Sequence, residues 1–155
     1  MTAAPAEPNP ALLLDNQLCF PLYAAARQVV SAYGPFLKPM GLTYTQYIVL
    51  LVLWERDGLT VGELCRRLLL DSGTLTPVLK RMETDGRLCR ERSREDERVV
   101  VVRLTDNGRA LRSEAVKIPA QMAACMPLTM EEALQLHSLL YKIIRRGGEP
   151  DDPEP

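Results

Sequence analysis

Four cysteines and one histidine are the side chains of this chain that most readily take part in thiol chemistry, base catalysis or zinc binding. The cysteines stand at positions 19, 65, 89 and 125, with no Cys-x-x-Cys pair, and the histidine is His137. These residues do not have the spacing of an ordinary zinc site, and a single histidine offers little for base catalysis. We therefore expect no metal and no cofactor. A cysteine on an apolar helix is most often an inert packing residue, so these thiols alone indicate no reaction.

A group of hydroxyl and basic side chains between residues 71 and 98 is suited to contacting DNA. Small hydroxyl residues at a helix start allow close approach to base edges, and cations one or two turns later reach phosphates. Arg94 is expected at a hairpin tip, entering a minor groove, with Asp96 and Arg98 paired across the turn. The candidate DNA-contacting residues are Ser72, Thr74, Thr76, Lys80, Arg81, Arg90, Arg92, Arg94, Asp96 and Arg98. For any single residue, a solvated surface position is the alternative.

The elements that position these residues are expected to form a winged helix-turn-helix. A Thr-x-x-Glu capping box at residues 60–63 begins the first helix. The second helix opens at Asp71, and Pro77 lies early enough in it that the missing N–H is a small loss. Residues 88–92 and 98–104 are expected to form a hairpin. Helix, turn, helix and basic hairpin in this order predict a DNA-binding module.

Helical periodicity continues on both sides of this module and predicts a mostly α fold with a small β-hairpin wing. Further helices are expected at residues 12–33 with a bend at Pro21, 43–56 after a capping box, 105–121 capped by Thr105, and 129–146 after another capping box. Long helices at both ends have too few partners within one chain to bury their apolar faces. We therefore expect a helical dimer interface.

Composition separates a folded part from two arms. The hydrophobic fraction of 46% is enough for a core, whereas residues 1–10 and 147–155 have little to bury and should be disordered. We expect a dimerisation region at 11–40 and 105–146 around a winged domain at 41–104. Residues 56–112 hold 13 Lys and Arg against 10 Asp and Glu, which only weakly favours nucleic acid. No membrane span or signal peptide is evident, so a cytoplasmic location is expected.

The winged order with long helices at both ends resembles the MarR family of dimeric bacterial regulators. Four segments resemble its organic-hydroperoxide-sensing branch, OhrR: residues 14–20 (LDNQLCF), 41–47 (GLTYTQY), 53–58 (LWERDG) and 70–77 (LDSGTLTP). The resemblance covers residues 12–137, and the segment around Cys19 is the branch-specific motif. It implies a homodimeric repressor, not an enzyme, that binds an inverted-repeat DNA operator and releases it on oxidation by an organic hydroperoxide.

The same resemblance implies roles for individual residues. Cys19 matches the peroxide-reactive thiolate, and Tyr33 and Tyr44 match tyrosines that hydrogen-bond it in the reduced form; Tyr47 is expected to line the same pocket. In a subset of the branch a second cysteine, matched by Cys125, forms a disulfide with the reactive cysteine of the partner subunit. Other members use an external small thiol. Cys65 and Cys89 have no such context and are expected in the core of the winged domain.

A distance argument tests the pairing of Cys19 with Tyr33. The two residues are 14 positions apart, or about 21 Å along a continuous helix at about 1.5 Å per residue. They cannot touch within one straight helix. Either Tyr33 comes from the other chain or Pro21 reshapes the helix, and we expect the other chain.

Two other functions are compatible with parts of this pattern. A thiol peroxidase would also use a reactive and a resolving cysteine, although it has no use for a hydroxyl-rich recognition helix and a basic wing. A MarR-type regulator that binds a phenolic or carboxylate ligand non-covalently would keep the DNA-binding half. In that case Cys19 would be incidental.

Overall fold

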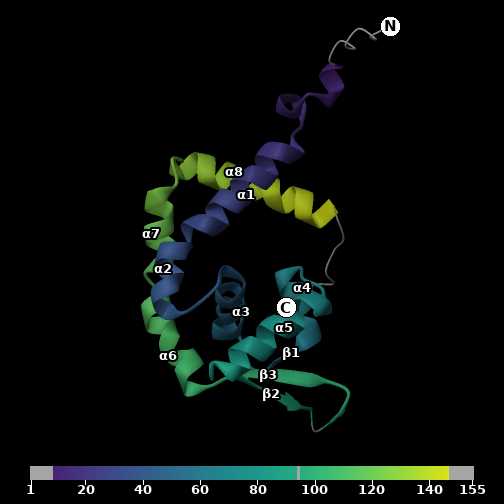
Figure 1. The fold of residues 1–155 in the computed structure, drawn as a ribbon, viewed down its shortest axis with the longest axis vertical. Coiled ribbons are helices and arrows are strands. Elements are labelled where there is room, and N and C mark those ends of the chain that lie inside the picture. Colours follow the sequence, from purple (N-terminus) through teal and green to yellow (C-terminus); the bar gives the residue numbers. More distant parts are fainter. Residues whose placement is uncertain (1–8, 94, 147–155) are drawn as a thin grey trace, which may run out of the picture.

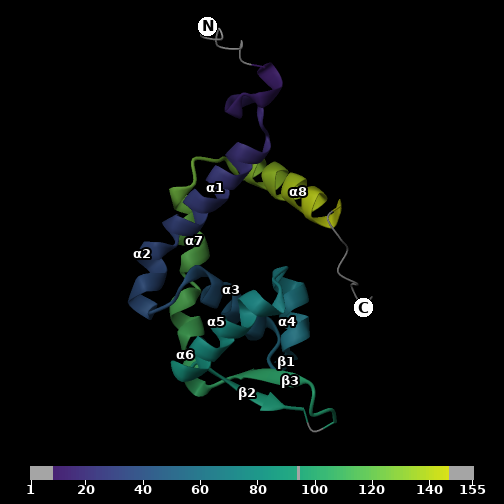
Figure 2. The same ribbon diagram turned by 45° about the vertical axis from the view of Figure 1, so that its right-hand side comes forward.

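Two helical regions flank a winged centre in the computed structural model, which describes residues 9–93 and 95–146. The small sheet lies at one end of the molecule and helices α1 and α8 lie at the other, in both views (Figures 1 and 2). The helices are η1 Pro10–Leu12, η2 Leu14–Asn16, α1 Cys19–Ala32, α2 Gly34–Leu37, η3 Lys38–Met40, α3 Tyr44–Glu55, α4 Val61–Leu68, α5 Ser72–Thr84, α6 Asp106–Ala115, α7 Ile118–Cys125 and α8 Met130–Arg146, and the strands are β1 Leu59–Thr60, β2 Leu88–Arg92 and β3 Val100–Leu104.

The winged centre consists of α3, α4 and α5 packed on an antiparallel sheet of order β1-β3-β2. The expected hairpin is present, with Leu88 opposite Leu104 and Arg92 opposite Val100. Sequence analysis missed β1, because its two residues are too short for any alternation to show. The second hairpin strand begins at Val100 and not at residue 98. The expected fold class, mostly α with a small wing, is confirmed.

Local hydrogen bonds begin the helices where the capping residues predict. At α3 the backbone N–H of Thr43 donates to Gln46 Oε1 (3.0 Å), and that of Gln46 donates to Thr43 Oγ1 (3.3 Å). The same reciprocal pair joins Thr60 and Glu63 at α4. Before α5, Asp71 Oδ1 accepts from the N–H of Thr74 (2.8 Å). These bonds satisfy N–H groups that lack an intrahelical acceptor.

The core is centred on α3, the most apolar helix. Tyr47, Val49, Leu50 and Leu53 are buried on it. They share one cluster with residues of α4, α5 and the sheet, namely Leu64, Leu75, Leu79, Met82, Leu88 and Val102. Trp54 is half-buried and donates its indole N–H to the carbonyl of Gly108 (2.9 Å), which ties α3 to α6. The core therefore fixes the recognition helix α5 and the wing relative to α3.

The terminal helices have apolar faces that nothing in the described chain covers. Helix α1, described over its full length, has no buried residue, and Leu18 before it is 78% exposed. On α8, Leu134 and Leu139 are 63% and 59% exposed. This is the unpartnered surface that a dimer interface requires. Among the described residues no single helix is long and apolar enough to cross a membrane.

Two expected helices differ from the structure. Residues 10–16 form 3-10 turns and α1 begins only at Cys19, because Asn16 and Gln17 donate side-chain bonds back to the carbonyls of Pro10 (2.8 Å) and Ala11 (2.6 Å). The prediction of a single helix at 105–121 is also wrong. It ends at Ala115, and α7 begins at Ile118 with Pro119 in its first turn, where proline lacks the N–H that would continue α6.

Candidate functional site

Cys19 is the first residue of α1, and its side chain is exposed. Pro21 lies in the first turn of the helix, where an N–H has no intrahelical acceptor to lose. Helix α1 therefore runs unbroken to Ala32, and the alternative in which Pro21 reshapes it is removed. Within one chain Cys19 and Tyr33 lie at opposite ends of α1, about 21 Å apart by helical rise.

Tyr33, Tyr44 and Tyr47 form a cluster where α1 ends and α3 begins, which we call the tyrosine cluster. The ring centroids of Tyr33 and Tyr44 are 4.9 Å apart, and those of Tyr33 and Tyr47 are 5.7 Å apart. Burial raises the pKa of all three phenols above the ordinary value, and Coulombic interaction with Tyr44 adds to the shift at Tyr33. The three phenols therefore stay protonated at neutral pH and can donate hydrogen bonds.

The other cysteines occupy three different environments. Cys125 is the last residue of α7 and is exposed. Cys65 is half-buried and packs against the core, as expected. Cys89 is half-buried on β2, with its Sγ 3.7 Å from the carbonyl oxygen of Arg103. It is not part of the described core cluster, so its expected place in the core is wrong. The two thiols singled out by the resemblance are thus the two exposed ones.

The start of α5 presents the expected hydroxyl residues. Ser72 and Thr74 are exposed and Thr76 is half-buried. The Thr74 hydroxyl also donates to Asp71 Oδ2 (2.7 Å), so it takes part in the helix cap. Pro77 is the sixth residue of α5 and not a first-turn residue, so the expectation that its missing N–H falls at the helix start is wrong.

The basic residues that follow differ in the partners that their side chains contact. Lys80 and Arg81 are exposed on α5, and Arg81 Nε lies 3.2 Å from Asp85 Oδ1. On the wing, Arg92 donates to the carbonyl of Glu97 (2.8 Å). The expected Asp96–Arg98 side-chain pair is replaced by a bond from the backbone N–H of Arg98 to Asp96 Oδ1 (2.9 Å). Arg94 lies outside the described residues.

Arg90 is engaged inside the domain and is not turned out toward a DNA backbone. Its Nε and Nη2 donate to Glu83 Oε2 (3.0 and 2.6 Å), and its backbone N–H donates to Glu83 Oε1 (2.9 Å). These hydrogen bonds lower the pKa of the Glu83 carboxyl. Sequence analysis missed Glu83, whose only signal was an acidic residue seven positions before an arginine. The Glu83–Arg90 pair fastens the wing to the recognition helix.

Arg87 is a second residue that sequence analysis missed. Its side chain is only 11% exposed, and the guanidinium donates to the carbonyl of Gly41 (2.7 Å) and to Gln46 Oε1 (3.3 Å). Both acceptors flank Tyr44. No spacing rule connects residues more than 40 positions apart, so only the fold reveals this contact.

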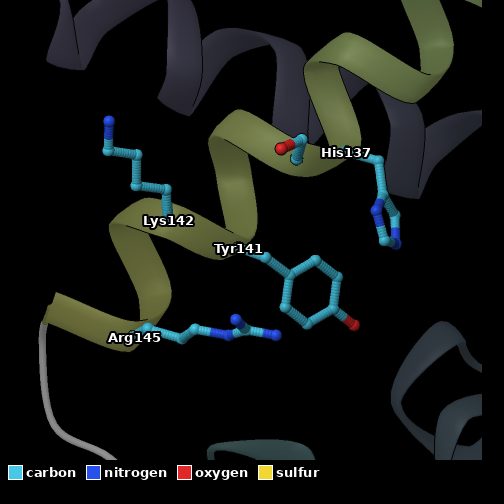
Figure 3. A pocket seen from close by; sticks show the side chains of 5 residues that line it. His137, Tyr141, Lys142 and Arg145 are labelled. Carbon is cyan, nitrogen blue, oxygen red and sulfur yellow. The ribbon is translucent and has the colours of Figure 1, made fainter.

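A shallow hollow on α8 is lined by side chains of that helix alone (Figure 3). His137 and Tyr141 lie with ring centroids 4.6 Å apart, beside Lys142 and Arg145. His137 is thus an ordinary exposed helix residue, as expected. Among the described residues no group of three or more His, Cys, Asp or Glu is arranged to hold a metal ion.

Comparisons with known proteins identify the family. The family described as transcriptional regulator SarA/Rot matches residues 31–115. The organic hydroperoxide resistance transcriptional regulator of Bacillus subtilis is 47% identical over 84% of this chain and 89% of its own length. The regulator TtmR of Methylorubrum extorquens is 50% identical over 90% of this chain and 74% of its own length.

Solved structures of related proteins support the same family. Reduced AbfR bound to DNA, a protein of Staphylococcus epidermidis, is 37% identical with a TM-score of 0.75, covering 86% of this chain and 91% of that one. Disulfide-formed AbfR is 41% identical with a TM-score of 0.61, covering 83% and 92%. The shared winged fold and the identity to the Bacillus subtilis regulator decide the assignment: the chain belongs to the MarR family of transcriptional regulators, in the branch of the organic hydroperoxide resistance regulators.

Proposed function

We propose that this regulator is a homodimeric repressor that senses organic hydroperoxides through Cys19. The observation that carries the proposal is the tyrosine cluster at one end of a straight α1 whose other end presents Cys19. If the uncovered α1 helices of two subunits cross, Cys19 of one subunit reaches the tyrosine cluster of its partner. Residues 11–40 and 105–146 are then the dimerisation region and 41–104 the DNA-binding domain.

The proposed chemistry begins with the Cys19 thiolate, which phenol O–H groups favour without adding charge. The sulfur attacks the peroxide oxygen, the O–O bond breaks, and the organic part leaves as an alcohol after taking one proton. Cys19 is thereby oxidised to a sulfenic acid. The apolar residues Phe20 and Leu22 beside it favour hydroperoxides with organic tails over hydrogen peroxide.

The sulfenic acid then condenses with the thiol of Cys125 of the partner subunit, forming a disulfide and releasing water. A disulfide requires Cα atoms within about 7 Å, so if the two thiols start far apart in the reduced dimer, α1 and the end of α7 must come together to form it. Because α6 joins α7 to the wing, this movement changes the spacing of the two DNA-binding domains.

The DNA-binding half follows the geometry of dimeric winged regulators. Two α5 helices about one DNA turn apart would read an inverted repeat. Ser72, Thr74 and Thr76 are the proposed base-edge and phosphate contacts, and Lys80, Arg81, Arg92, Arg94 and Arg98 the proposed phosphate and minor-groove contacts. An operator overlapping a promoter would be occluded, which gives repression.

The test is a gel shift on the promoter of the regulator's own gene, before and after an organic hydroperoxide and then a reductant. Wild type should release the DNA on oxidation and rebind on reduction. Cys19→Ser should bind the same DNA and ignore the hydroperoxide. Normal release by Cys19→Ser would refute a redox sensor at this residue and favour a non-covalent ligand.

A second variant separates the resolving step from the sensing step. Cys125→Ser should lose the intersubunit disulfide on a non-reducing gel and accumulate sulfinic acid or a mixed disulfide. An unaltered disulfide in this variant would contradict the role of Cys125. Sustained turnover of hydroperoxide with a thiol reductant and no DNA binding would instead identify a thiol peroxidase.

A further inference from the structure

Arg87 joins the recognition helix, the wing and the start of α6 through its backbone. Its N–H donates to the carbonyl of Met82 at the end of α5 (2.9 Å), and its carbonyl accepts from the N–H of Thr105 (3.2 Å). The next residue, Leu88, begins β2 and is buried. Any displacement of Arg87 therefore moves the end of α5 and the base of the wing with it.

The guanidinium of Arg87 reaches in the opposite direction, to the segment that leads from η3 into the first turn of α3. It donates to the carbonyl of Gly41 (2.7 Å) and to Gln46 Oε1 (3.3 Å). Gly41 has a φ of +65°, and a Cβ there would lie 2.9 Å from Arg87 Nη2. The guanidinium thus packs directly on the backbone at a position whose left-handed conformation favours glycine.

The acceptors of Arg87 are part of the structure that holds the tyrosine cluster. Gln46 is buried, lies between Tyr44 and Tyr47 in the sequence, and accepts from the backbone N–H of Thr43 to complete the cap of α3. One glutamine side chain therefore both fixes the first turn that carries two tyrosines and binds the arginine. A shift of this turn cannot leave Arg87 unaffected.

We propose that Arg87 is the positioning residue that couples the tyrosine cluster to the DNA-binding elements, so that a change at the cluster displaces α5 and the wing. This inference rests on the proposed function, since it assigns the route by which oxidation of Cys19 lowers operator affinity. The contacts explain the direction of the effect. The side chain also donates to the carbonyl of Met40 (3.4 Å), just before Gly41. A nearly buried cation that lost these three acceptors would keep Asp85, whose carboxylate lies 3.5 Å away, so it follows the segment that binds it.

The required movement is small. Hydrogen bonds of 2.7 to 3.3 Å are lost when the atoms separate by about 1 Å, and packed elements respond to such shifts by changing position as units. The coupling is measured as the ratio of operator Kd in the oxidised protein to that in the reduced protein. A residue that transmits the change controls this ratio, whereas a residue that only stabilises the domain does not.

The experiment measures that ratio for full-length wild type, Arg87→Met and Arg87→Lys with organic hydroperoxide as oxidant. Arg87→Met should reduce the ratio at least tenfold, because the oxidised variant keeps its operator. Loss of the Cys19 thiol and formation of the disulfide should proceed at wild-type rates. Arg87→Lys should be intermediate, since one ammonium cannot bind both acceptors in the geometry of a guanidinium.

Arg109→Met is the matched control. Arg109 also joins elements of the winged domain, donating to the carbonyl of Leu104 (2.6 Å) with Asp57 3.6 Å away, but neither partner belongs to the first turn of α3. Its ratio should equal that of wild type. If Arg87→Met fails to fold, Gln46→Met, which removes the acceptor and keeps a helix-forming side chain, should lower the ratio in the same direction.

The possible results distinguish a failure of the role of Arg87 from a failure of the proposed function. A wild-type ratio in Arg87→Met, or a smaller ratio caused only by weak binding of the reduced form, would overturn the role of Arg87 and leave the sensor intact. A wild-type protein that kept its operator after Cys19 oxidation would overturn the proposed function and this coupling with it.

Discussion

The Glu83–Arg90 pair offers a sharp test, because it replaces an expected phosphate contact by an internal one. Its two side-chain bonds and one backbone bond hold β2 against the second half of α5. We consider Glu83→Gln, which removes the charge and keeps the shape, and Arg90→Gln, which removes the cation. If Arg90 positions the wing, both variants should weaken operator binding to a similar degree.

The magnitude follows from the geometry and exposure of the pair. Charge-assisted hydrogen bonds contribute roughly 1.5–3 kcal/mol when shielded from water, and exposed ion pairs contribute about 0.2–1 kcal/mol. The side chains of Arg90 and Glu83 are 25% and 36% exposed, which places the pair between these cases, at about 1–2 kcal/mol. If all of this free energy is lost from operator binding, the affinity falls by about 5- to 30-fold per protomer.

The assay is fluorescence anisotropy of an operator duplex at several salt concentrations. A lost phosphate contact lowers the slope of log K against log salt by roughly 0.9 per contact, or about 1.8 for a dimer, whereas a lost positioning contact leaves the slope unchanged. We expect unchanged slopes for both variants and an Arg90→Gln/Glu83→Gln double variant no weaker than either single one. A reduced slope in Arg90→Gln with full affinity in Glu83→Gln would refute this reasoning and restore Arg90 as a phosphate ligand.

Four further outcomes are expected. Glu83→Gln should have a lower Tm than wild type in calorimetry, and this difference should be fully present above pH 4.5, the ordinary pKa of the carboxyl group. The difference should vanish as the pH falls through the lowered pKa of Glu83 in the folded protein. Gly108→Ala should lower the free energy of unfolding by about 2–4 kcal/mol in urea titrations, since its Cβ would overlap the carbonyl of Arg87, whereas Gly34→Ala, with open space, should change it by less than about 1 kcal/mol. Tyr33→Phe should slow thiol oxidation by hydroperoxide in stopped-flow measurements without changing operator Kd in the reduced form; equal rates would remove the phenol from the chemistry. Leu139→Glu should yield a monomer in light scattering while circular dichroism stays helical, and a persistent dimer would exclude the α8 face as the interface.

Features governed by neighbours in the sequence could be predicted without the fold. The capping boxes at Thr43 and Thr60 join groups three residues apart, so the side chains present are enough to start those helices. The β-branched run before Thr105 likewise indicates a strand, and the motif around Cys19 indicates the family branch. Each of these signals is complete within a few residues, which is why it survives in the bare sequence.

Two helix boundaries and the contacts between distant residues became evident only in the structure. The start of α1 at Cys19 depends on amide side chains that bind back to the preceding turn. The break between α6 and α7 places Pro119 in the first turn of a helix, where proline is tolerated, and not in a helix interior. The engagement of Arg90 by Glu83 and of Arg87 by Gln46 required the wing, α5 and α3 to be placed together.

The sequence by itself predicted the winged order and the family branch, and it separated Cys19 from Tyr33 by about 21 Å of helical rise, which left either a second subunit or a reshaping of the helix at Pro21. The tertiary structure decided how the parts are connected: Tyr33 at the end of α1 meets two tyrosines of α3 in one cluster, and Arg87, between α5 and β2, reaches the segment that leads into α3. Hydrophobic burial of α3 brings these residues together, and burial is a property of the whole chain and not of any short segment of it.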